Sequence, residues 1–297
     1  HSRICSASLA KLVDEGCQVV GVITAPDKPA GRGMELQQSA VKKYALEKGL
    51  NILQPEKLKN PEFLENLKSL KADLQIVVAF RMLPEVVWNM PPMGTLNLHG
   101  SLLPQYRGAA PINWAIINGE KVTGVTTFKL KHEIDTGDIL LAAEIKIEED
   151  DNAGTLHDKM MHIGAEVLFK TVVGLAENSI NKTPQSNLDI KHAPKIFTET
   201  CKIDWNKSSA EIHNLIRGLS PYPAAFTYLD EKKLKIFNSK TEKTTPKLSP
   251  GNYESDGKSF LRFSCTDGYI NILELQLEGK KRMNVEDFLR GYRFSNQ

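Results

Sequence analysis

Apolar runs alternate with helix-like amphipathic stretches over the first 120 residues of the chain. An apolar run rich in β-branched residues is typical of a buried strand, and residues 76–80 form such a run. Further strands are predicted at 19–24, 52–53 and 95–99. Helices are predicted between them, with Ser39 as a cap and Gly16 and Gly49 as stops, at 7–15, 39–48, 61–70 and 111–117. Strands that alternate with helices predict parallel β-α-β units. The expected fold is therefore α/β, with a doubly wound, Rossmann-like, mostly parallel sheet.

The pattern changes after residue 120. Two further strands are predicted at 122–130 and 139–147, and only the eight residues 131–138 separate them. A parallel crossover needs a dozen or more residues, so this pair is expected to be antiparallel. A long helix with apolar positions at helical spacing is predicted next, at 154–175.

A polar stretch without strong periodicity then predicts an interdomain linker. The expected domains are a catalytic domain at 1–178, the linker at 179–200 and a C-terminal domain at 201–297. The C-terminal part begins with a helix that Ser208 and Glu211 cap, and Asn284 can cap a last helix. Short strands separated by turns, including a hairpin turn at 266–268, predict a small OB-like β-barrel.

Composition excludes several classes of protein. The 297 residues are 41% hydrophobic and 25% charged, which is ordinary for a globular protein. There is no apolar run of the ~20 residues that span a membrane and no signal-peptide pattern. The four cysteines lie far apart without a CxxC pair, which indicates reduced thiols and a cytoplasmic protein. No sequence pattern indicates a metal site.

Charge is distributed unevenly along the chain. The net charge is +2, from 38 basic and 36 acidic residues, but residues 201–297 hold 16 Lys and Arg against 12 Asp and Glu. The mildly basic C-terminal part permits a polyanionic partner without requiring one.

The first candidate site is the end of the strand at 95–99. Strand alternation places Asn97 and His99 on one face, at the carboxyl end where open α/β sheets bind ligands. An amide and an imidazole placed side by side can donate to a developing oxyanion. The alternative is that the two side chains satisfy each other and a loop.

The second candidate site is the loop between the antiparallel strands. It carries Asp135 and Asp138 around Thr136 and Gly137. Two carboxylates beside a glycine are also what an ordinary turn contains. Spacing alone does not decide between a turn and a site.

The two candidate sites together resemble one family. Asn97-x-His99, Ser101-Leu-Leu-Pro104 and Asp135-Thr-Gly-Asp138 form the signature of enzymes that use 10-formyltetrahydrofolate as a formyl donor. Within that family the chain resembles the methionyl-tRNA formyltransferases through four further segments: Pro26-Asp-Lys-Pro-Ala-Gly-Arg-Gly33, Tyr106-Arg-Gly-Ala-Ala-Pro-Ile-Asn113, Ile203-Asp-Trp205 and Leu277-Glu-Gly-Lys-Lys-Arg-Met283. The Gly-Thr-Pro-x-Phe loop of the family has no counterpart at residues 3–8.

The resemblance implies transfer of a formyl group from 10-formyltetrahydrofolate to the amino group of methionyl initiator tRNA, by direct attack through a tetrahedral intermediate. It implies catalytic roles for Asn97, His99 and Asp135. The residues expected at the folate are Phe80, Met82, Leu83, Ser101, Leu102, Leu103, Pro104, Thr136, Gly137 and Asp138. Those expected at the tRNA are Lys28, Arg32, Arg107, Lys280, Lys281 and Arg282.

The expected partners are initiator methionyl-tRNA and the small-molecule folate, with no membrane, and the chain is expected to be a monomer. A close alternative is another 10-formyltetrahydrofolate-dependent transferase, acting on a sugar nucleotide or glycinamide ribonucleotide, or a hydrolase with water as acceptor. A more distant one is an RNA-binding protein without catalysis. Ser101 is interpreted as a turn or cap residue rather than a nucleophile.

Overall fold

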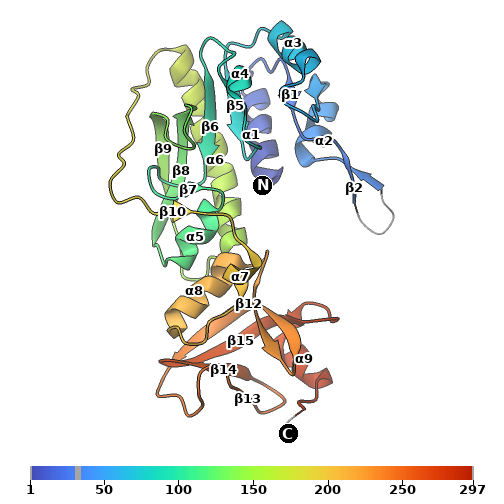
Figure 1. Ribbon diagram of the computed structural model, residues 1–297, viewed down its shortest axis with the longest axis vertical. Helices are drawn as coiled ribbons and strands as arrows, with labels where there is room; N and C mark the ends of the chain where they lie inside the picture. Colours follow the sequence, from blue (N-terminus) through green and yellow to red (C-terminus); the bar gives the residue numbers. More distant parts are fainter. Residues whose placement is uncertain (1, 31–34, 296–297) are drawn as a thin grey trace. The chain divides into compact units, whose positions relative to one another are not determined.

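The computed structural model describes residues 2–30 and 35–295 (Figure 1). Contacts divide the chain into two compact units. The first comprises residues up to 107 together with 124–145 and 157–191, and the second comprises 108–123, 146–156 and 192–297. The boundaries expected from the sequence, 1–178 and 201–297, stay a prediction.

The strands of the first unit form three sheets. β1 (Val22–Ile23) pairs in parallel with β4 (Ile52–Leu53), and β2 (Lys28–Ala30) forms an antiparallel hairpin with β3 (Glu35–Gln37). The third sheet has the order β5-β6-β8-β9, with the bounds Gln75–Val78, Thr95–His99, Val122–Lys129 and Ile139–Lys146.

Strand β6 lies inside this third sheet. It is parallel to β5, with Asn97 opposite Val77, and antiparallel to β8, with His99 opposite Thr126. β8 and β9 are neighbours and run in opposite directions. At the end next to the loop that joins them, the Lys129 amide donates to the Asp138 carbonyl. The predicted antiparallel pair and the α/β fold class are confirmed. β1–β4 and β5–β6 are parallel pairs, and β5–β6 continues into the antiparallel strands β8 and β9.

Helices cover these sheets on the apolar sides. They are α1 (Ser2–Asp14), α2 (Ala40–Glu47), α3 (Pro61–Ser69), α4 (Glu85–Trp88) and α6 (Ala153–Ala176). Leu12 of α1 and Leu168 of α6 meet Leu96 of β6 and Leu140 of β9 in one buried cluster. Because α1 begins at Ser2, residues 3–8 are helical. The predicted Ser39 cap is confirmed by a bond from the Lys42 amide to the Ser39 Oγ, 3.1 Å long.

The second unit is built around an antiparallel sheet with the strand order β11-β12-β15-β14-β13, to which β16 adds at β15. The strand bounds are Ala225–Leu229 (β11), Lys232–Lys243 (β12), Tyr253–Ser255 (β13), Leu261–Cys265 (β14), Gly268–Leu277 (β15) and Met283–Asn284 (β16). β7 (Arg107–Gly108) and β10 (His192–Ala193) form a separate two-stranded sheet. The helices are α5 (Pro111–Ile117), α7 (Thr198–Cys201), α8 (Ser209–Leu219) and α9 (Val285–Gly291).

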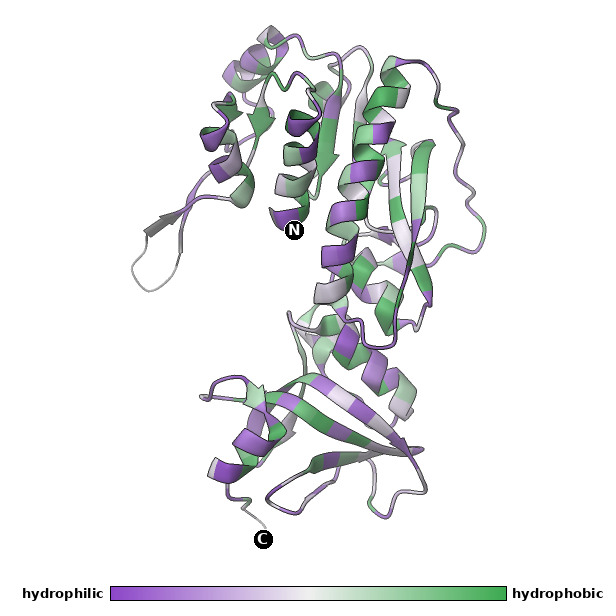
Figure 2. Ribbon diagram, turned by 180° about the vertical axis from the view of Figure 1, so that it is seen from behind, coloured by the Kyte–Doolittle hydropathy of each residue, from purple (hydrophilic) through white to green (hydrophobic). Residues whose placement is uncertain are grey.

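Alternating side chains explain the core of this sheet. Hydrophobic and hydrophilic residues alternate along β12 and β15 (Figure 2), so one face of each strand is buried. Helix α8 packs its apolar side into the same core through Ile212, Ile216 and Leu219. Its capping box between Ser208 and Glu211 is present as the sequence predicts.

Candidate active site

The side chains of Asn97 and His99 come from the carboxyl end of β6. Both neighbours of β6 are paired along this stretch, so the two side chains project from a fixed backbone. His99 is buried, with 6% of its surface exposed. The Asn97 Oδ1 is also buried, and it has no hydrogen-bond partner among the described residues. A buried unpaired amide oxygen costs about 1–3 kcal/mol, so the fold gains no stability from this group.

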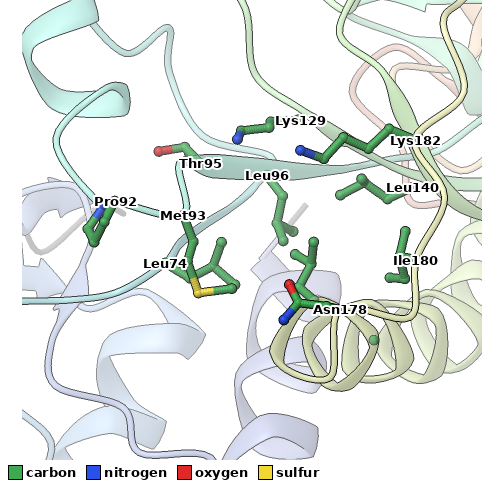
Figure 3. A pocket seen from close by; sticks show the side chains of 12 residues that line it. Leu74, Pro92, Met93, Thr95, Leu96, Lys129, Leu140, Asn178, Ile180 and Lys182 are labelled. Carbon is green, nitrogen blue, oxygen red and sulfur yellow. The ribbon is translucent and has the colours of Figure 1, made fainter.

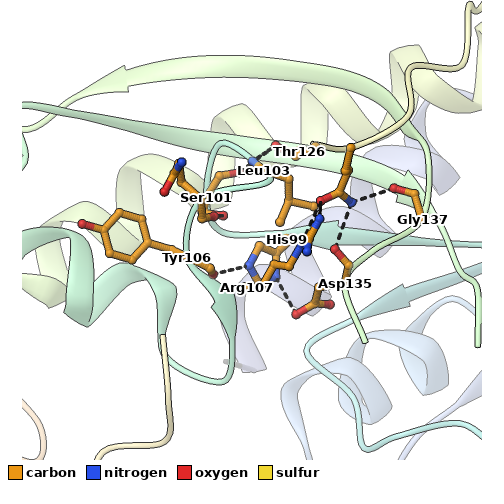
Figure 4. Close-up of polar contacts among 10 residues, drawn as sticks. His99, Ser101, Leu103, Tyr106, Arg107, Thr126, Asp135 and Gly137 are labelled. Atoms are coloured by element: carbon orange, nitrogen blue, oxygen red, sulfur yellow. Dashed lines mark hydrogen bonds and ion pairs between the residues drawn. The ribbon is translucent and has the colours of Figure 1, made fainter. Parts of the chain in front are cut away.

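The imidazole of His99 is hydrogen-bonded through one ring nitrogen and faces a carboxylate with the other (Figure 4). Its Nε2 lies 2.9 Å from the carbonyl oxygen of Tyr106. A carbonyl only accepts, so Nε2 carries the proton and donates. Nδ1 faces the Oδ2 of Asp135 at 3.9 Å, beyond direct hydrogen-bond distance. Nδ1 therefore has no direct hydrogen bond to Asp135, although the carboxylate lies close to it.

The backbone of the loop that carries Asp135 adopts conformations that few residue types tolerate. Asp135 itself has a φ of +54°, in the left-handed region that a non-glycine residue adopts at a cost. A Cβ on Gly137 would lie 1.5 Å from the Lys129 carbonyl oxygen, so only glycine fits there. An ion pair between Lys131 and Asp138, 2.8 Å long, ties the end of the loop.

The loop that carries Tyr106 is also closed by its own hydrogen bonds. The Ser101 hydroxyl donates to the Gln105 carbonyl at 2.6 Å. The Thr126 hydroxyl donates to the Ser101 carbonyl at 2.7 Å and accepts from the Leu103 amide at 3.1 Å. Ser101 is fully buried, and its hydroxyl forms part of a turn, in agreement with the sequence interpretation.

The other expected folate residues lie around these two loops or on the segment after β5. Phe80 and Leu83 pack against the buried cluster of Leu58, Phe63, Leu67 and Val87, whereas Met82 is 73% exposed. Leu103 is buried, Leu102 and Pro104 are half-buried, and the Thr136 hydroxyl donates to the Glu133 carbonyl. Their contacts with folate stay a prediction.

The expected tRNA residues are spread over both units, and each is described within its own. Lys28 is exposed on β2, and Arg32 lies outside the described residues. Arg107 donates to Gln185 from Nε at 3.1 Å and Nη2 at 2.8 Å, and its Nη1 donates to Asn187 at 3.1 Å. In the second unit Lys280 and Lys281 are exposed, while Arg282 forms an ion pair with Glu274.

The β2–β3 hairpin has an anchored base. Lys42 Nζ lies 2.5 Å from Asp27 Oδ2, and Gln54 Nε2 donates to Asp27 Oδ1 at 3.0 Å. The hydrogen bond from Lys42 holds the pKa of the Asp27 carboxyl below its ordinary value. Asp27 therefore fixes where the hairpin leaves the domain, a role that its motif did not reveal.

Sequence reasoning also missed Gln185. It lies in the polar stretch assigned to a linker, where no spacing or motif distinguishes it. In the structure its Nε2 donates to the carbonyl oxygens of Asp135 at 2.9 Å and Gly137 at 2.6 Å. A single glutamine in a polar segment carries no local signal, because its importance depends on contacts about 50 residues away along the chain.

A pocket of about 290 Å³ lies at the other end of β6 (Figure 3). Thr95 and Leu96 line it, together with Lys129, Asn178 and Lys182. Asn97 and His99 do not belong to its lining, so it is separate from the candidate active site. Within residues 2–30 and 35–295, no group of three or more metal-ligating side chains gathers, and none of the helices has the length and apolar character to cross a membrane.

Comparison with known proteins supports one interpretation of this geometry. The formyl transferase family model matches residues 2–172, and the model of the formyl transferase C-terminal domain matches residues 195–293. A methionyl-tRNA formyltransferase of Bacteroides fragilis is 54% identical over 294 residues, 96% of this chain and 91% of the relative. One of Phocaeicola vulgatus is 55% identical, over 97% of this chain and 93% of the relative. The chain belongs to the methionyl-tRNA formyltransferase family.

Two solved structures share the fold of the chain at lower identity. An N-formyltransferase of Helicobacter canadensis, in complex with folinic acid and dTDP-3-aminofucose, has a TM-score of 0.68 at 22% identity, covering 94% of this chain and 96% of that chain. HypX of Aquifex aeolicus, in complex with tetrahydrofolic acid, has a TM-score of 0.61 at 20% identity, covering 82% of this chain and 43% of that chain. The formyltransferase fold thus extends beyond the family to which this chain belongs.

Proposed function

We propose that the chain transfers the formyl group of 10-formyltetrahydrofolate to the α-amino group of methionyl initiator tRNA, in translation initiation in the cytoplasm. The observation that carries the proposal is the cluster at the end of β6. There a buried, unpaired Asn97 oxygen lies on the same strand as an imidazole that faces a carboxylate. The relatives that are 54–55% identical over nearly the whole chain are named for this reaction.

The reaction needs stabilisation of one charge and movement of two protons. The amine nitrogen attacks the formyl carbon, and the carbonyl electron pair moves onto oxygen to give a tetrahedral oxyanion. The bond from that carbon to the folate nitrogen then breaks. The attacking nitrogen loses a proton and the leaving nitrogen gains one, so the atoms and charges balance without a covalent enzyme intermediate.

Each residue of the cluster has a role in these steps. The Nδ1 proton of His99 and the Asn97 amide donate to the oxyanion, which preorganised donors stabilise by several kcal/mol. Asp135 supports the charged imidazole and accepts or relays a proton, directly or through water. The attacking amine needs little activation, because an α-amino pKa is about 8 and the ester bond lowers it.

Two loops are proposed to hold the folate. One is residues 101–107, with Ser101, Leu102, Leu103 and Pro104, and the other is residues 135–138. Phe80, Met82 and Leu83 extend the pocket along the segment after β5. Support comes from the backbone of these loops, which closes on both sides of His99 and offers peptide groups for a pterin ring.

The tRNA is proposed to bind through the β2–β3 hairpin and the C-terminal unit. The hairpin carries Lys28 and Arg32, and Lys280, Lys281 and Arg282 supply positive charge in the C-terminal unit. Lysine and arginine contacts to phosphates account for much of the affinity of proteins for nucleic acids. The mildly basic composition of residues 201–297 supports this assignment.

The acceptor is the part of the proposal that an experiment tests best. Purified protein is given 10-formyltetrahydrofolate with charged initiator tRNA, with uncharged tRNA, with an amino-sugar nucleotide, or with no acceptor. Formyl transfer to the charged tRNA alone is expected. Transfer to the sugar nucleotide, or folate turnover without an acceptor, would identify the alternative transferase or hydrolase.

A further inference from the structure

We propose that Gln185 is a positioning residue of the active site, which holds the Asp135 loop in place opposite His99, with Arg107 fixing Gln185 in turn. The inference rests on the proposed function, because it assigns a role to residues around the same cluster. It arises from the segment 183–191, whose polar side chains reach both loops of the site.

The carboxamide nitrogen of Gln185 bridges two peptide groups of the Asp135 loop. Nε2 donates to the Asp135 carbonyl at 2.9 Å and to the Gly137 carbonyl at 2.6 Å. An amide nitrogen has two hydrogens, so both are used. The bridge encloses Thr136 and holds Asp135 at its φ of +54°, a conformation that persists only when its surroundings fix it.

The carboxamide oxygen of Gln185 accepts two hydrogen bonds from Arg107. Arg107 donates to it from Nε at 3.1 Å and from Nη2 at 2.8 Å, a two-pronged contact that sets the plane of the amide. The Nη1 of Arg107 reaches the Asn187 side chain on the same segment, 3.1 Å away. The amide therefore cannot rotate to exchange its oxygen and nitrogen without losing all of these bonds.

The network closes around His99. The Tyr106 carbonyl accepts the proton of Nε2 at 2.9 Å, and the next residue is Arg107. Residues 106 and 107 thus act on both ring nitrogens of His99. Tyr106 bonds Nε2 directly. Arg107 holds Gln185, which holds the loop whose Asp135 carboxylate faces Nδ1. Displacement of this loop would change the 3.9 Å separation of Nδ1 and Asp135.

The polarity of the amide provides the test. In Gln185→Glu the carboxylate still accepts from Arg107, but it places oxygen against two carbonyl oxygens. In Gln185→Ala both contacts are lost. If the Nε2 group of Gln185 positions Asp135, both variants should lower kcat by at least ~10-fold, since small misplacements of catalytic groups cost up to ~10² in rate. The KM for charged tRNA should stay near wild type. Leu188→Ala, an exposed position on the same segment, is the matched control and should keep wild-type kcat.

Two results would overturn the inference. One is a Gln185→Glu variant with wild-type kcat, which would reduce Gln185 to a support for Arg107. The other is a raised KM for tRNA at unchanged kcat, which would place the network in substrate binding. In the Asp135→Ala background, adding Gln185→Ala should cost nothing further, because Gln185 acts through Asp135. Full additivity of the two losses would contradict the proposal.

A measurement without substrates separates this inference from the proposed function. Amide hydrogen exchange over residues 133–138 should be faster in Gln185→Glu than in wild type and unchanged in Leu188→Ala. Unchanged exchange in Gln185→Glu would overturn the positioning role, whatever the enzyme formylates. Faster exchange in Gln185→Glu, together with a wild-type protein that formylates no tRNA, would uphold the role and reject the proposed function.

Discussion

The Nε2 of His99 donates to the carbonyl oxygen of Tyr106 over 2.9 Å, and this bond decides which side of the imidazole does chemistry. With Nε2 occupied, only Nδ1 faces the Asp135 carboxylate and the space beside it. The ring cannot flip without leaving a buried N–H or carbonyl unpaired, which costs about 1–3 kcal/mol. The backbone after the strand therefore fixes the orientation of the catalytic ring.

Asn97→Ala should separate stability from activity. The Asn97 Oδ1 is buried without a partner among the described residues, so removing the amide should leave the thermal midpoint unchanged or raise it. Loss of one oxyanion donor should lower kcat by at least ~10². Calorimetry and single-turnover assays measure the two effects. Wild-type turnover with a lower midpoint would assign Asn97 to the fold instead.

Asp135→Asn should damage catalysis although it is nearly isosteric. Asparagine tolerates the left-handed backbone of this position, so the loop should keep its shape. The neutral amide no longer supports a charged imidazole, and kcat should fall by ~10² or more. The rate is measured from pH 6 to 8, with the circular dichroism spectrum as a control for folding. A variant with the full rate across that range would make Asp135 a turn residue.

Arg32→Ala should weaken the use of charged tRNA, the formyl acceptor, and leave binding of folate, the formyl donor, unchanged. Arg32 follows strand β2 in the sequence, and Lys42 and Gln54 hold Asp27, the residue before that strand, in place. A lower kcat/KM for charged tRNA is expected, with the Kd for folate near wild type and a slightly smaller salt dependence of tRNA binding. Loss of folate binding with intact tRNA affinity would move the hairpin to the donor side.

His213 should make the fold less stable below neutral pH. Burial, and then the nearby charge of Arg217, lower the pKa of His213, whose Nδ1 lies 2.9 Å from the Ser239 hydroxyl. Below the unfolded value of about 6.5 the unfolded chain binds a proton that the folded chain does not. The free energy of unfolding should therefore fall as the pH falls from 7.5 to 5.5.

His213→Gln supplies the control for that effect, because glutamine has no titrating group. The decrease in thermal midpoint between pH 7.5 and 5.5 should be smaller in the variant than in wild type. Equal decreases in the two proteins would show that another group is responsible.

The sequence predicts the elements around the site better than the contacts that complete it. Strand β6 and helix α5 have the bounds that the pattern predicts, because Gly94 and Gly100 flank the strand, and Pro111 and the pair Asn118-Gly119 mark the ends of the helix. The hairpin β2–β3 is not predicted, since its residues lack alternation and its base depends on the ion pair of Asp27 with Lys42. Local patterns reveal burial and periodicity, whereas these contacts join positions far apart in the chain.

The same limit applies to the candidate site. Asn97, His99 and Asp135 are predicted through the resemblance of their motifs, and the structure brings His99 and Asp135 together. The Tyr106 carbonyl and the Gln185 amide are absent from that prediction. A carbonyl is common to every residue, and a glutamine in a polar stretch is unremarkable, so neither has a signal in the amino-acid pattern.

The most direct test of this account is the single-turnover rate of formyl transfer from labelled 10-formyltetrahydrofolate to charged initiator tRNA, in wild type and in His99→Ala. Both proteins should bind folate with similar Kd and be fully folded at the assay temperature. The wild type should form formyl-methionyl-tRNA, and the variant should do so at least ~10² more slowly. Equal rates in the two proteins would contradict the central role of His99 and of the cluster at the end of β6.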